Sequence, residues 1–349
     1  MSLAPLLRRR TISAAAALAL ATGIGVAAGA GAATSSAAPC TKRVLIVGAM
    51  PSEIGVVLRA TTVQQKVTVD GRRFYVGKLA GNNVVLAMSG IGLVNAEQTA
   101  TAAFKQFRCG TANGISATVF TGVSGGPKLI GDVMVPAKWR RSGNPDASWV
   151  QVNPTMMAVA RQAAATVKLE SRAPVGDVAC ACVYQPDRIK PVNLKREPRV
   201  YFDGAGASAD PFGGEKFFCV PNGGNVFGCE PCRDQAHSPK ALPPFINDFR
   251  PYIGPSFFTN YFKPTTPDET PYVAGDMETA AVAEVAKKNN TPFIGFRALS
   301  DGKGDPLLLS KLPSVVVPAW VIQFAYYQQI AADNAGRLTI AFLKGWAQH

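Results

Sequence analysis

The amino-acid sequence predicts an α/β protein in which helices cover a central β-sheet. Three observations support this class. Short apolar runs rich in β-branched residues recur at 42–50, 82–92 and 117–126, a helical pattern separates the last two runs, and hydrophobic residues make up 47% of the 349 residues. Strands that alternate with helices are typical of α/β proteins, and this hydrophobic content is enough to fill a large core.

The first 38 residues have the pattern of an export signal. Arg8, Arg9 and Arg10 precede an Ala/Leu-rich run, and small residues follow as far as Ala38. This order is typical of a signal peptide, of either the general secretory or the twin-arginine type. A membrane anchor is the alternative, but the run is weakly apolar and no charged stop follows it. We expect a secreted or extracytoplasmic protein that keeps +10 of the +13 formal charge once these three arginines are removed.

The predicted strands carry polar or glycine-rich motifs where they end. The run at 42–50 continues into AMPSE, the run at 82–92 ends in SGIG, and the run at 117–126 ends in TGVSGG. A later strand, 292–299, is expected to stop at the Ser-Asp of SDG. Ligands of α/β sheets gather at the carboxyl ends of strands, so we expect the functional site there.

Three segments have helical patterns. Residues 94–107 form the helix between two strands, and a run of small apolar residues begins a helix at Met277 and Glu278. Residues 320–343 have apolar side chains at helical spacing, which predicts a helix that packs on the sheet.

The pattern breaks down between about 180 and 250, and we interpret this segment as an insertion into a single domain that spans 41–349. It is dense in Pro, Gly and aromatic residues and holds five of the seven cysteines. Cys229 and Cys232 form a CxxC motif with His237 nearby, which allows zinc, but export favours disulfides. Cys40 and Cys109 each precede a strand, and we expect them to be bonded. One of the other five cysteines would then be free.

Several function classes are excluded or disfavoured. His237 and His349 are the two histidines of the chain, so a Ser-His-Asp triad on the sheet is excluded. The GIGLVN motif lacks the third glycine of a dinucleotide fingerprint, and GGPK is not a phosphate-binding P-loop. Basic residues are scattered, which disfavours a nucleic-acid groove. We therefore expect no cofactor, no metal and no nucleic-acid partner.

Three carboxylates stand at or near strand ends instead. Glu53 follows the first strand, Glu278 opens a helix, and Asp301 follows a later strand. Each alone is compatible with a surface carboxylate or a charge at a helix N-terminus. Together, in a chain almost without histidine, they indicate acid–base chemistry by carboxyl groups.

The motifs VLIVGAMPSEI, SGIGLVNA, TGVSGG…IGDVMVP and GDMETAAVAEVAKKNNTPFIGFRALSDG resemble the nucleoside phosphorylase/nucleosidase superfamily. Within it they are most similar to the 5′-methylthioadenosine/S-adenosylhomocysteine nucleosidases. The resemblance covers about 42–135 and 252–345 and fails across the insertion. It implies a three-layer α/β/α fold with a twisted mixed sheet, cleavage of the bond between ribose and a purine, and a dimer or hexamer.

The resemblance also implies roles for individual residues. Asp301 matches the acid that protonates N7 of the departing base, and we expect burial to raise its pKa. Glu53 matches the group that takes a proton from water, and Glu278 matches the carboxylate that binds the 2′- and 3′-hydroxyls. The remaining matches are to substrate-binding positions: Met277 on the sugar face, Ser89 and Arg297 beside the water, Phe257 stacked on the base, and Ser300 next to the acid. Asp276 replaces a usual Glu, a difference we expect to have no effect.

Hydrolysis is favoured over phosphorolysis. Related phosphorylases hold phosphate with arginines in the first loop and after the second strand, whereas this chain has an acid in AMPSE and no arginine in SGIGLVN. A carboxylate facing the nucleophile favours water over a phosphate dianion. Arg297 alone supports a purine nucleoside phosphorylase, which is the alternative.

A storage or nucleoside-binding protein with a relic site is an alternative of another class, because some exported plant proteins of this fold have little catalytic activity. The presence of Glu53, Glu278 and Asp301 together argues against it. The sequence decides neither the nucleoside and its 5′ substituent nor the oligomeric state.

Overall fold

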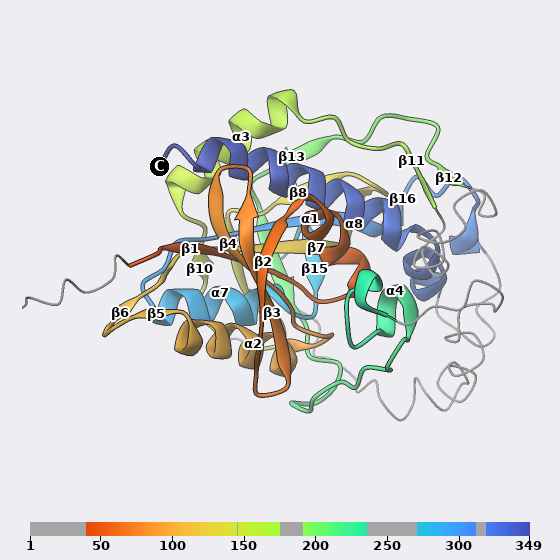
Figure 1. Ribbon diagram of the computed structural model, residues 1–349. Coiled ribbons are helices and arrows are strands. Elements are labelled where there is room, and N and C mark those ends of the chain that lie inside the picture. The colour runs from red at the N-terminus through yellow and green to blue at the C-terminus, as the bar shows by residue number, and fades with distance from the viewer. Residues whose placement is uncertain (1–39, 145, 175–190, 236–270, 312–318) are drawn as a thin grey trace, which may run out of the picture. The chain divides into compact units, whose positions relative to one another are not determined.

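A computed structural model of the chain describes residues 40–144, 146–174, 191–235, 271–311 and 319–349 (Figure 1). Its strands are β1 Arg43–Gly48, β2 Thr62–Val69, β3 Arg72–Leu79, β4 Asn82–Met88, β5 Arg108–Cys109, β6 Ala112–Asn113, β7 Ile115–Leu129, β8 Val133–Val135, β9 Lys138–Arg141, β10 Val150–Gln151, β11 Arg172–Pro174, β12 Pro191–Asn193, β13 Val200–Phe202, β14 Ala205–Ser208, β15 Ala274–Asp276 and β16 Phe293–Lys303. Its helices are α1 Pro51–Ala60, α2 Leu93–Gln106, α3 Pro154–Thr166, α4 Gly224–Phe227, α7 Thr279–Lys288 and α8 Ala319–Trp346, with short 3₁₀ turns η3 Cys232–Asp234 and η4 Leu309–Lys311.

A mixed sheet forms the centre of the described chain. Its main path runs β10-β9-β14-β15-β7-β1-β4-β3-β2. Off this path, β16 pairs with β7, β8 pairs with β16, and β13 pairs with β8. β1 pairs in parallel with both β4 and β7, and β7 pairs in parallel with β16, whereas β2, β3 and β4 form antiparallel neighbours. The central strands are buried on both faces, which explains their nearly continuous apolar sequences.

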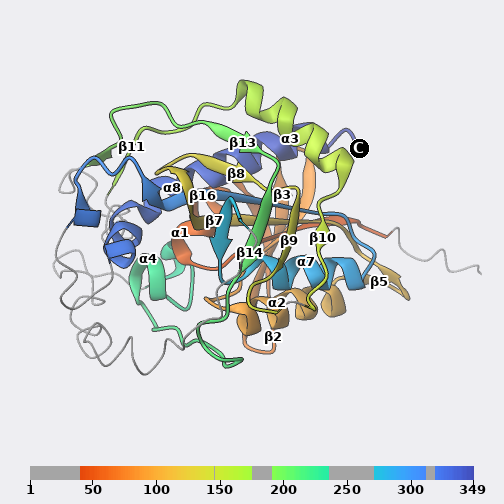
Figure 2. The ribbon, with the colours of Figure 1, turned by 180° about the vertical axis from the view of Figure 1, so that it is seen from behind.

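Helices cover both faces of this sheet. Figures 1 and 2 show α2 and α7 on one face and α3 and α8 on the other. The long helix α8 buries residues at helical spacing, among them Tyr327, Ile330, Leu338 and Phe342. The predicted three-layer α/β/α architecture is therefore confirmed, and so is the expectation that the C-terminal helix packs on the sheet.

Two strands run further than the sequence predicts. β16 does not stop at Leu299 but continues to Lys303, with register shifts against β7 on both sides of Asp301. β7 likewise continues past Gly126 to Leu129. Such irregularities bend a strand and re-aim its side chains. Asp301 therefore reaches the site from a bulged strand and not from a loop that follows a strand.

The segment predicted as an insertion needs a correction. β13 and β14 lie within it, and both belong to the main sheet, since β14 stands between β9 and β15. Their few residues gave no clear alternation in the sequence. The segment predicted to be an export signal, residues 1–38, lies outside the described residues, as do residues 175–190 and residues 236–270, which include His237.

Two disulfide bonds join described cysteines. Cys40 is bonded to Cys109 across 69 residues, as predicted, because parallel pairing of β1 and β7 brings the starts of these strands together. Cys219 is bonded to Cys229, and Cys232 is disulfide-bonded as well. The prediction of one free cysteine depends on Cys180 and Cys182, which lie outside the described residues.

Of the described helices, none has the length and apolar character needed to cross a membrane.

Candidate active site

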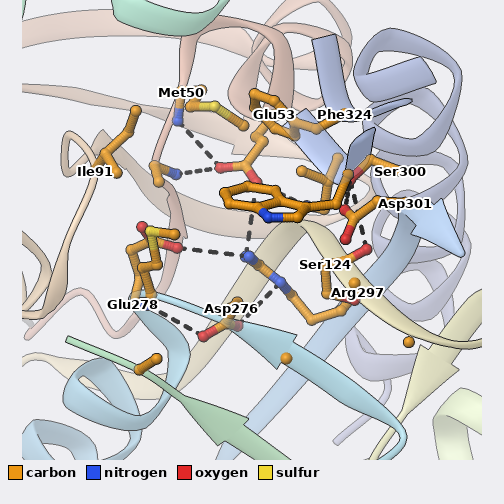
Figure 3. A pocket seen from close by; sticks show the side chains of 18 of the residues that line it. Met50, Glu53, Ile91, Ser124, Asp276, Glu278, Arg297, Ser300, Asp301 and Phe324 are labelled. Atoms are coloured by element: carbon orange, nitrogen blue, oxygen red, sulfur yellow. Dashed lines mark hydrogen bonds and ion pairs between the residues drawn. The ribbon is translucent and has the colours of Figure 1, made fainter. Parts of the chain in front are cut away.

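A cavity of about 580 Å³ lies where β7, β15 and β16 end and where α1, α7 and α8 begin (Figure 3). Six of the residues predicted from the sequence line it: Glu53, Met277, Glu278, Arg297, Ser300 and Asp301. They come from two parts of the chain more than 200 positions apart. The structure therefore brings the predicted acid, the predicted base and the predicted ribose carboxylate to one hollow, while their roles stay predictions.

Ser89 is a predicted residue that is not among the described lining residues, and its hydroxyl donates a hydrogen bond to the Gly90 carbonyl (2.8 Å). Phe257 lies outside the described residues, so its predicted place is not tested.

Backbone N–H groups fix Glu53, which is fully buried in the first turn of α1. Its Oε2 accepts hydrogen bonds from Ala49 N (2.5 Å) and Met50 N (3.1 Å), and its Oε1 accepts one from Val123 N (2.7 Å). A carboxylate offers about four acceptor positions, so one position remains for a water in the cavity. Burial raises the pKa of Glu53, while the charge of Arg297 and the three N–H groups act in the opposite direction.

Arg297 is the centre of a buried charge cluster. Its guanidinium faces three carboxylates: Nε lies 3.1 Å from Asp276 Oδ2, Nη2 lies 3.5 Å from Glu278 Oε2, and Nη1 lies 3.7 Å from Glu53 Oε1. It also stacks over the Phe120 ring, 4.8 Å from the centroid. With one cation against three anions in a buried place, the cluster favours protonation of one carboxyl group.

Glu278 shows this effect most clearly. Its Oε1 accepts a hydrogen bond from Gly92 N (2.9 Å) at the start of α2. Burial raises the pKa of Glu278 to about 8; the charge of Arg297 opposes the rise, and Asp276 and Glu53 add to it. Glu278 lines the cavity, and its two hydrogen bonds among the described residues, from Gly92 N and Arg297 Nη2, leave acceptor positions for a diol.

Asp276 was expected only to be a harmless replacement of a Glu, and no role was predicted for it; its hydrogen bonds organise this part of the site. Its Oδ1 accepts hydrogen bonds from Glu278 N (3.1 Å), Thr279 N (3.2 Å) and the Ser208 hydroxyl, and its Oδ2 accepts one from the Thr279 hydroxyl. These contacts cap the first turn of α7 and hold the carboxylate against Arg297. The signal in the sequence was an Asp three positions before the first helical residue, Thr279.

Asp301 has few polar neighbours. Its Oδ1 accepts a hydrogen bond from the Ser300 hydroxyl (2.8 Å), and no ion pair with it is found among the described residues. Burial raises the pKa of Asp301, which confirms the prediction, and the Ser300 hydrogen bond only partly offsets this. Gly125 faces it on β7, where a Cβ atom would come within 2.5 Å of Asp301 Oδ2. Gly125, the second glycine of TGVSGG, thus leaves space for the Asp301 side chain.

We expect Gly122→Ala to damage the site. A Cβ atom at Gly122 would overlap Glu53 Oε1 and approach Arg297 Nη1 to 2.5 Å. A catalytic group displaced by about 1 Å typically costs about 100-fold in rate, so kcat/KM should fall by about that factor. Gly55→Ala in the same helix as Glu53 is the matched control, because its Cβ would meet only the flexible end of Arg59. Equal kcat/KM for the two variants would contradict the assigned geometry.

Apolar side chains complete the walls, and the sequence did not reveal most of them. They come from the segment after β14 and from the start of α8, and include Phe212, Phe217, Val226, Phe227, Trp320, Val321 and Phe324. Phe212 follows a short strand that the sequence did not predict, so the rule of strand ends was not applied to it.

Among the described residues, no three His, Cys, Asp or Glu side chains gather to hold a metal ion.

The arrangement is suited to proton transfer on two sides of a bound molecule. Figure 3 shows Asp301 and Ser300 on one side of the cavity, Glu278 and Ile91 on the other, and Glu53 between them at the wall formed by α1. One carboxyl group with a raised pKa can donate a proton, and one carboxylate with an open acceptor position can take a proton from water.

Comparisons with known proteins agree with this fold. The family model described as the phosphorylase superfamily matches residues 43–209. A curated relative, the uncharacterized protein Rv2293c of Mycobacterium tuberculosis, is 38% identical over 201 residues, which are 56% of this chain and 80% of the relative. The 5′-methylthioadenosine/S-adenosylhomocysteine nucleosidase of Tolumonas auensis is 24% identical over 306 residues, 86% of this chain and 99% of the relative.

Solved structures of similar fold include two hydrolases. One is the 5′-methylthioadenosine/S-adenosylhomocysteine nucleosidase of Neisseria meningitidis in complex with methylthio-immucillin-A, with a TM-score of 0.53 and 20% identity over 87% of this chain and 99% of that one. The other is futalosine hydrolase of Helicobacter pylori, with a TM-score of 0.50 and 17% identity over 86% of this chain and 97% of that one. At these identities the likeness concerns the fold.

Proposed function

Because the chain belongs to the phosphorylase superfamily, we propose that it is a nucleosidase that hydrolyses the N-ribosidic bond of purine nucleosides. One observation carries this proposal: a single cavity holds Asp301, a carboxyl group whose pKa is raised by burial, and Glu53, a buried carboxylate with one acceptor position left open. Relatives named as nucleosidases support the reaction type.

The proposed mechanism uses both carboxyl groups. Asp301 donates its proton to the purine as the bond from C1 of the ribose to the base nitrogen breaks, so the base leaves as a neutral molecule. Glu53 takes a proton from water as the water oxygen bonds to C1 on the opposite face. The sugar passes through an oxocarbenium-like state, as in inverting glycosidases, and each proton transfer typically contributes a factor of about 10²–10⁴.

Water is favoured over phosphate as the nucleophile. Arg297 is the only basic side chain among the described residues that line the cavity, and it already faces Asp276, Glu53 and Glu278. A phosphate dianion would meet these three carboxyl groups, and the described lining residues offer it no cation besides Arg297. Phosphorolysis would therefore need charge from elsewhere.

Purine release in the presence and absence of phosphate tests the function. The protein would be incubated with adenosine, inosine and 5′-methylthioadenosine, and the sugar product identified by chromatography. We expect free base and free ribose (or its 5′-substituted form) at a rate that phosphate does not change. Formation of ribose 1-phosphate would indicate a phosphorylase. Absence of both cleavage and nucleoside binding would favour a storage protein.

Glu278→Gln tests the diol role. An ionised carboxylate accepts hydrogen bonds from both ribose hydroxyls, and bonds to a charged group contribute about 1.5–3 kcal/mol, so kcat/KM for adenosine should fall by about 10- to 100-fold. Because the pKa of Glu278 is about 8, adenosine affinity should rise as the pH rises through this value, and the variant should lose that dependence. A loss as large on 2′-deoxyadenosine as on adenosine would contradict the role.

We also propose that the protein acts outside the cytoplasm. The arginine-led apolar segment at 1–38 supports export, and the bonds Cys40–Cys109 and Cys219–Cys229 are suited to an oxidising compartment. Salvage of external nucleosides is a role that fits this location.

A further inference from the structure

Asp276 makes the shortest contact with the buried cation of the site. Its Oδ2 lies 3.1 Å from Arg297 Nε, and both side chains are buried. The two carboxyl groups assigned to the reaction lie further from the same guanidinium, 3.5 Å away for Glu278 and 3.7 Å away for Glu53. Figure 3 shows that the three contacts leave the guanidinium in different directions. The nearest anion to Arg297 is therefore one to which the proposed mechanism gives no part.

The Asp276 carboxylate is itself held in place. Four hydrogen bonds reach it, from backbone and hydroxyl groups at the start of α7 and from the Ser208 hydroxyl. Ser208 on β14 lies opposite Asp276 on β15, and the Ser208 hydroxyl also accepts a hydrogen bond from Ala280 N (2.9 Å). A strand and a helix thus fix the position of this negative charge, and the charge fixes the side of the site on which Arg297 lies.

Arg297 has few directed contacts besides this ion pair. Among the described residues, its Nε and Nη1 have no hydrogen-bond partner, and its Nη2 donates one long hydrogen bond of 3.5 Å to Glu278 Oε2. The Phe120 ring lies 4.8 Å from the guanidinium carbon and attracts the cation without giving it a direction in the plane of the ring. Without the charge of Asp276, the guanidinium could therefore turn toward another carboxyl group.

Glu278 is the carboxyl group toward which the guanidinium would turn. Glu53 already accepts hydrogen bonds from three backbone N–H groups. Besides the long bond from Arg297, Glu278 accepts one hydrogen bond from the described residues, donated by Gly92 N (2.9 Å). Glu278 is both nearer to the cation and less satisfied, so a released Arg297 should move onto Glu278 and away from Glu53.

The proposed reaction needs this cation to be shared, and this step rests on the proposed function. Glu278 must be ionised to bind the diol, and Glu53 must be ionised to take a proton from water. Burial raises the pKa of both carboxyl groups, and the charge of Arg297 opposes the rise in both. If Arg297 paired closely with one of them, protonation of the other would be favoured.

We propose that Asp276 is a positioning residue for the reaction: it holds Arg297 between Glu53 and Glu278, so that both carboxyl groups share one cation. It acts through Arg297 and not on the reacting atoms. The pair of Asp276 and Ser208, which β14 and β15 bring together, is thus part of the catalytic arrangement although neither side chain carries a step of the mechanism.

A purely electrostatic role of Asp276 predicts a different outcome. Removal of its charge alone would lower the pKa of Glu278 and leave the guanidinium where it is. Release of the guanidinium toward Glu278 would also lower that pKa, but Glu53 would lose its cation and its pKa would rise. The position of Arg297 and the pKa of Glu53 therefore distinguish the two roles.

Asp276→Asn tests the proposal. In its crystal structure, the guanidinium should lie closer to Glu278 than 3.5 Å and further from Glu53 than 3.7 Å. NMR titration with ¹³C-labelled glutamate carboxyl groups, assigned with Glu53→Gln and Glu278→Gln, measures both pKa values without substrate. We expect the pKa of Glu278 to fall from about 8 by at least about 1 pH unit and that of Glu53 to rise.

The pH dependence of the reaction gives a second readout of Asp276→Asn. Adenosine affinity should rise at a lower pH than in the wild-type protein, because Glu278 ionises at a lower pH. The acid limb of kcat should move to higher pH, because Glu53 ionises at a higher pH. Loss of structure alone would not move these two dependences in opposite directions.

Two variants serve as controls. Thr279→Val removes a hydroxyl that donates to Asp276 but keeps the negative charge, so its thermal stability should fall while both glutamate pKa values stay near those of the wild-type protein. Asp276→Glu keeps the charge and should keep the wild-type pH dependence. A guanidinium that stays in place in Asp276→Asn, or a pKa of Glu53 that falls or does not change, would overturn the proposal.

Asp276→Ser covers the case in which Asp276→Asn does not fold. A serine hydroxyl can accept a hydrogen bond from the N–H groups at the start of α7, but it carries no charge. The same movement of Arg297 and the same opposite pKa changes are expected in this variant, and their absence would count equally against the proposal.

The titration and the crystal structure need no turnover, so this inference and the proposed function can fail separately. Opposite pKa changes in a protein that releases no base from nucleosides would support the positioning of Arg297 and contradict the nucleosidase. Base release by the wild-type protein, with an unmoved Arg297 in Asp276→Asn, would do the reverse.

Discussion

Asp301→Asn is expected to lower kcat for adenosine by about 10²–10⁴, with nucleoside affinity nearly unchanged. An amide has nearly the shape of the carboxyl group, but it cannot give a proton to the departing purine. The Ser300 hydroxyl donates a hydrogen bond to Asp301 Oδ1 (2.8 Å). The amide oxygen of asparagine can accept the same hydrogen bond, so the local structure should persist. Steady-state kinetics of base release and calorimetric binding measure the two quantities separately.

Two comparisons make this prediction specific. Asp305→Asn changes a buried Asp that does not line the cavity, and its kcat should stay near the wild-type value. A riboside with a 4-nitrophenol leaving group needs no protonation, so Asp301→Asn should cleave it nearly as fast as the wild-type protein. Near-wild-type turnover of adenosine by Asp301→Asn would refute the acid role.

The pH profile gives a further check on Asp301. A general acid works only while protonated, and burial raises the pKa of Asp301 above its ordinary value. Activity should therefore extend to higher pH than an exposed aspartic acid would allow and fall as the pH rises through the raised pKa. The nitrophenyl riboside should not show this alkaline fall.

Glu53→Gln has the second large expected effect, a fall in kcat by about 10²–10⁴. The amide cannot take a proton from water. The amide also cannot accept all three backbone hydrogen bonds, because its NH₂ group would face the N–H donor of Ala49, Met50 or Val123. A buried group left without its partner costs about 1–3 kcal/mol, so thermal unfolding should be measured alongside kcat.

Rescue by azide distinguishes loss of the general base from loss of protein stability. Glu53→Ala leaves space beside the sugar, and azide needs no deprotonation to attack C1. Azide should therefore restore base release in Glu53→Ala and give ribosyl azide, whereas it should not rescue Asp301→Asn on adenosine. Glu284→Gln, which changes a Glu paired with Arg141 and away from the cavity, is the control and should need no rescue. Failure of azide in folded Glu53→Ala would count against the base role.

The carboxylates of the site could be predicted because their signals are local. In the sequence, Glu53 and Asp301 follow apolar strand-like runs and Glu278 opens a helical run, so a strand-end rule places them together, although β16 continues past Asp301 to Lys303. Asp276 could not be recognised, since its importance comes from contacts with Ser208 and Arg297 that only folding creates. The bulge that carries Asp301 depends on pairing between β16 and β7, which no stretch of either strand encodes alone.

The phenylalanines that line the cavity escaped prediction for a different reason. Phe212, Phe217 and Phe227 lie where strands are short and periodicity is absent, and the segment that carries them is held by a disulfide and by Asp234. The aromatic residue predicted to stack on the base, Phe257, lies outside the described residues, so that role stays a prediction.

A crystal structure of Asp301→Asn with an intact purine nucleoside would test the central claim most directly. We expect the residue 301 side chain at about 3 Å from N7 of the base, the ribose hydroxyls on Glu278, and a water held by Glu53 on the face of C1 opposite the base. A nucleoside bound with its base away from residue 301, or with Glu53 and residue 301 on the same face of the sugar, would contradict the mechanism.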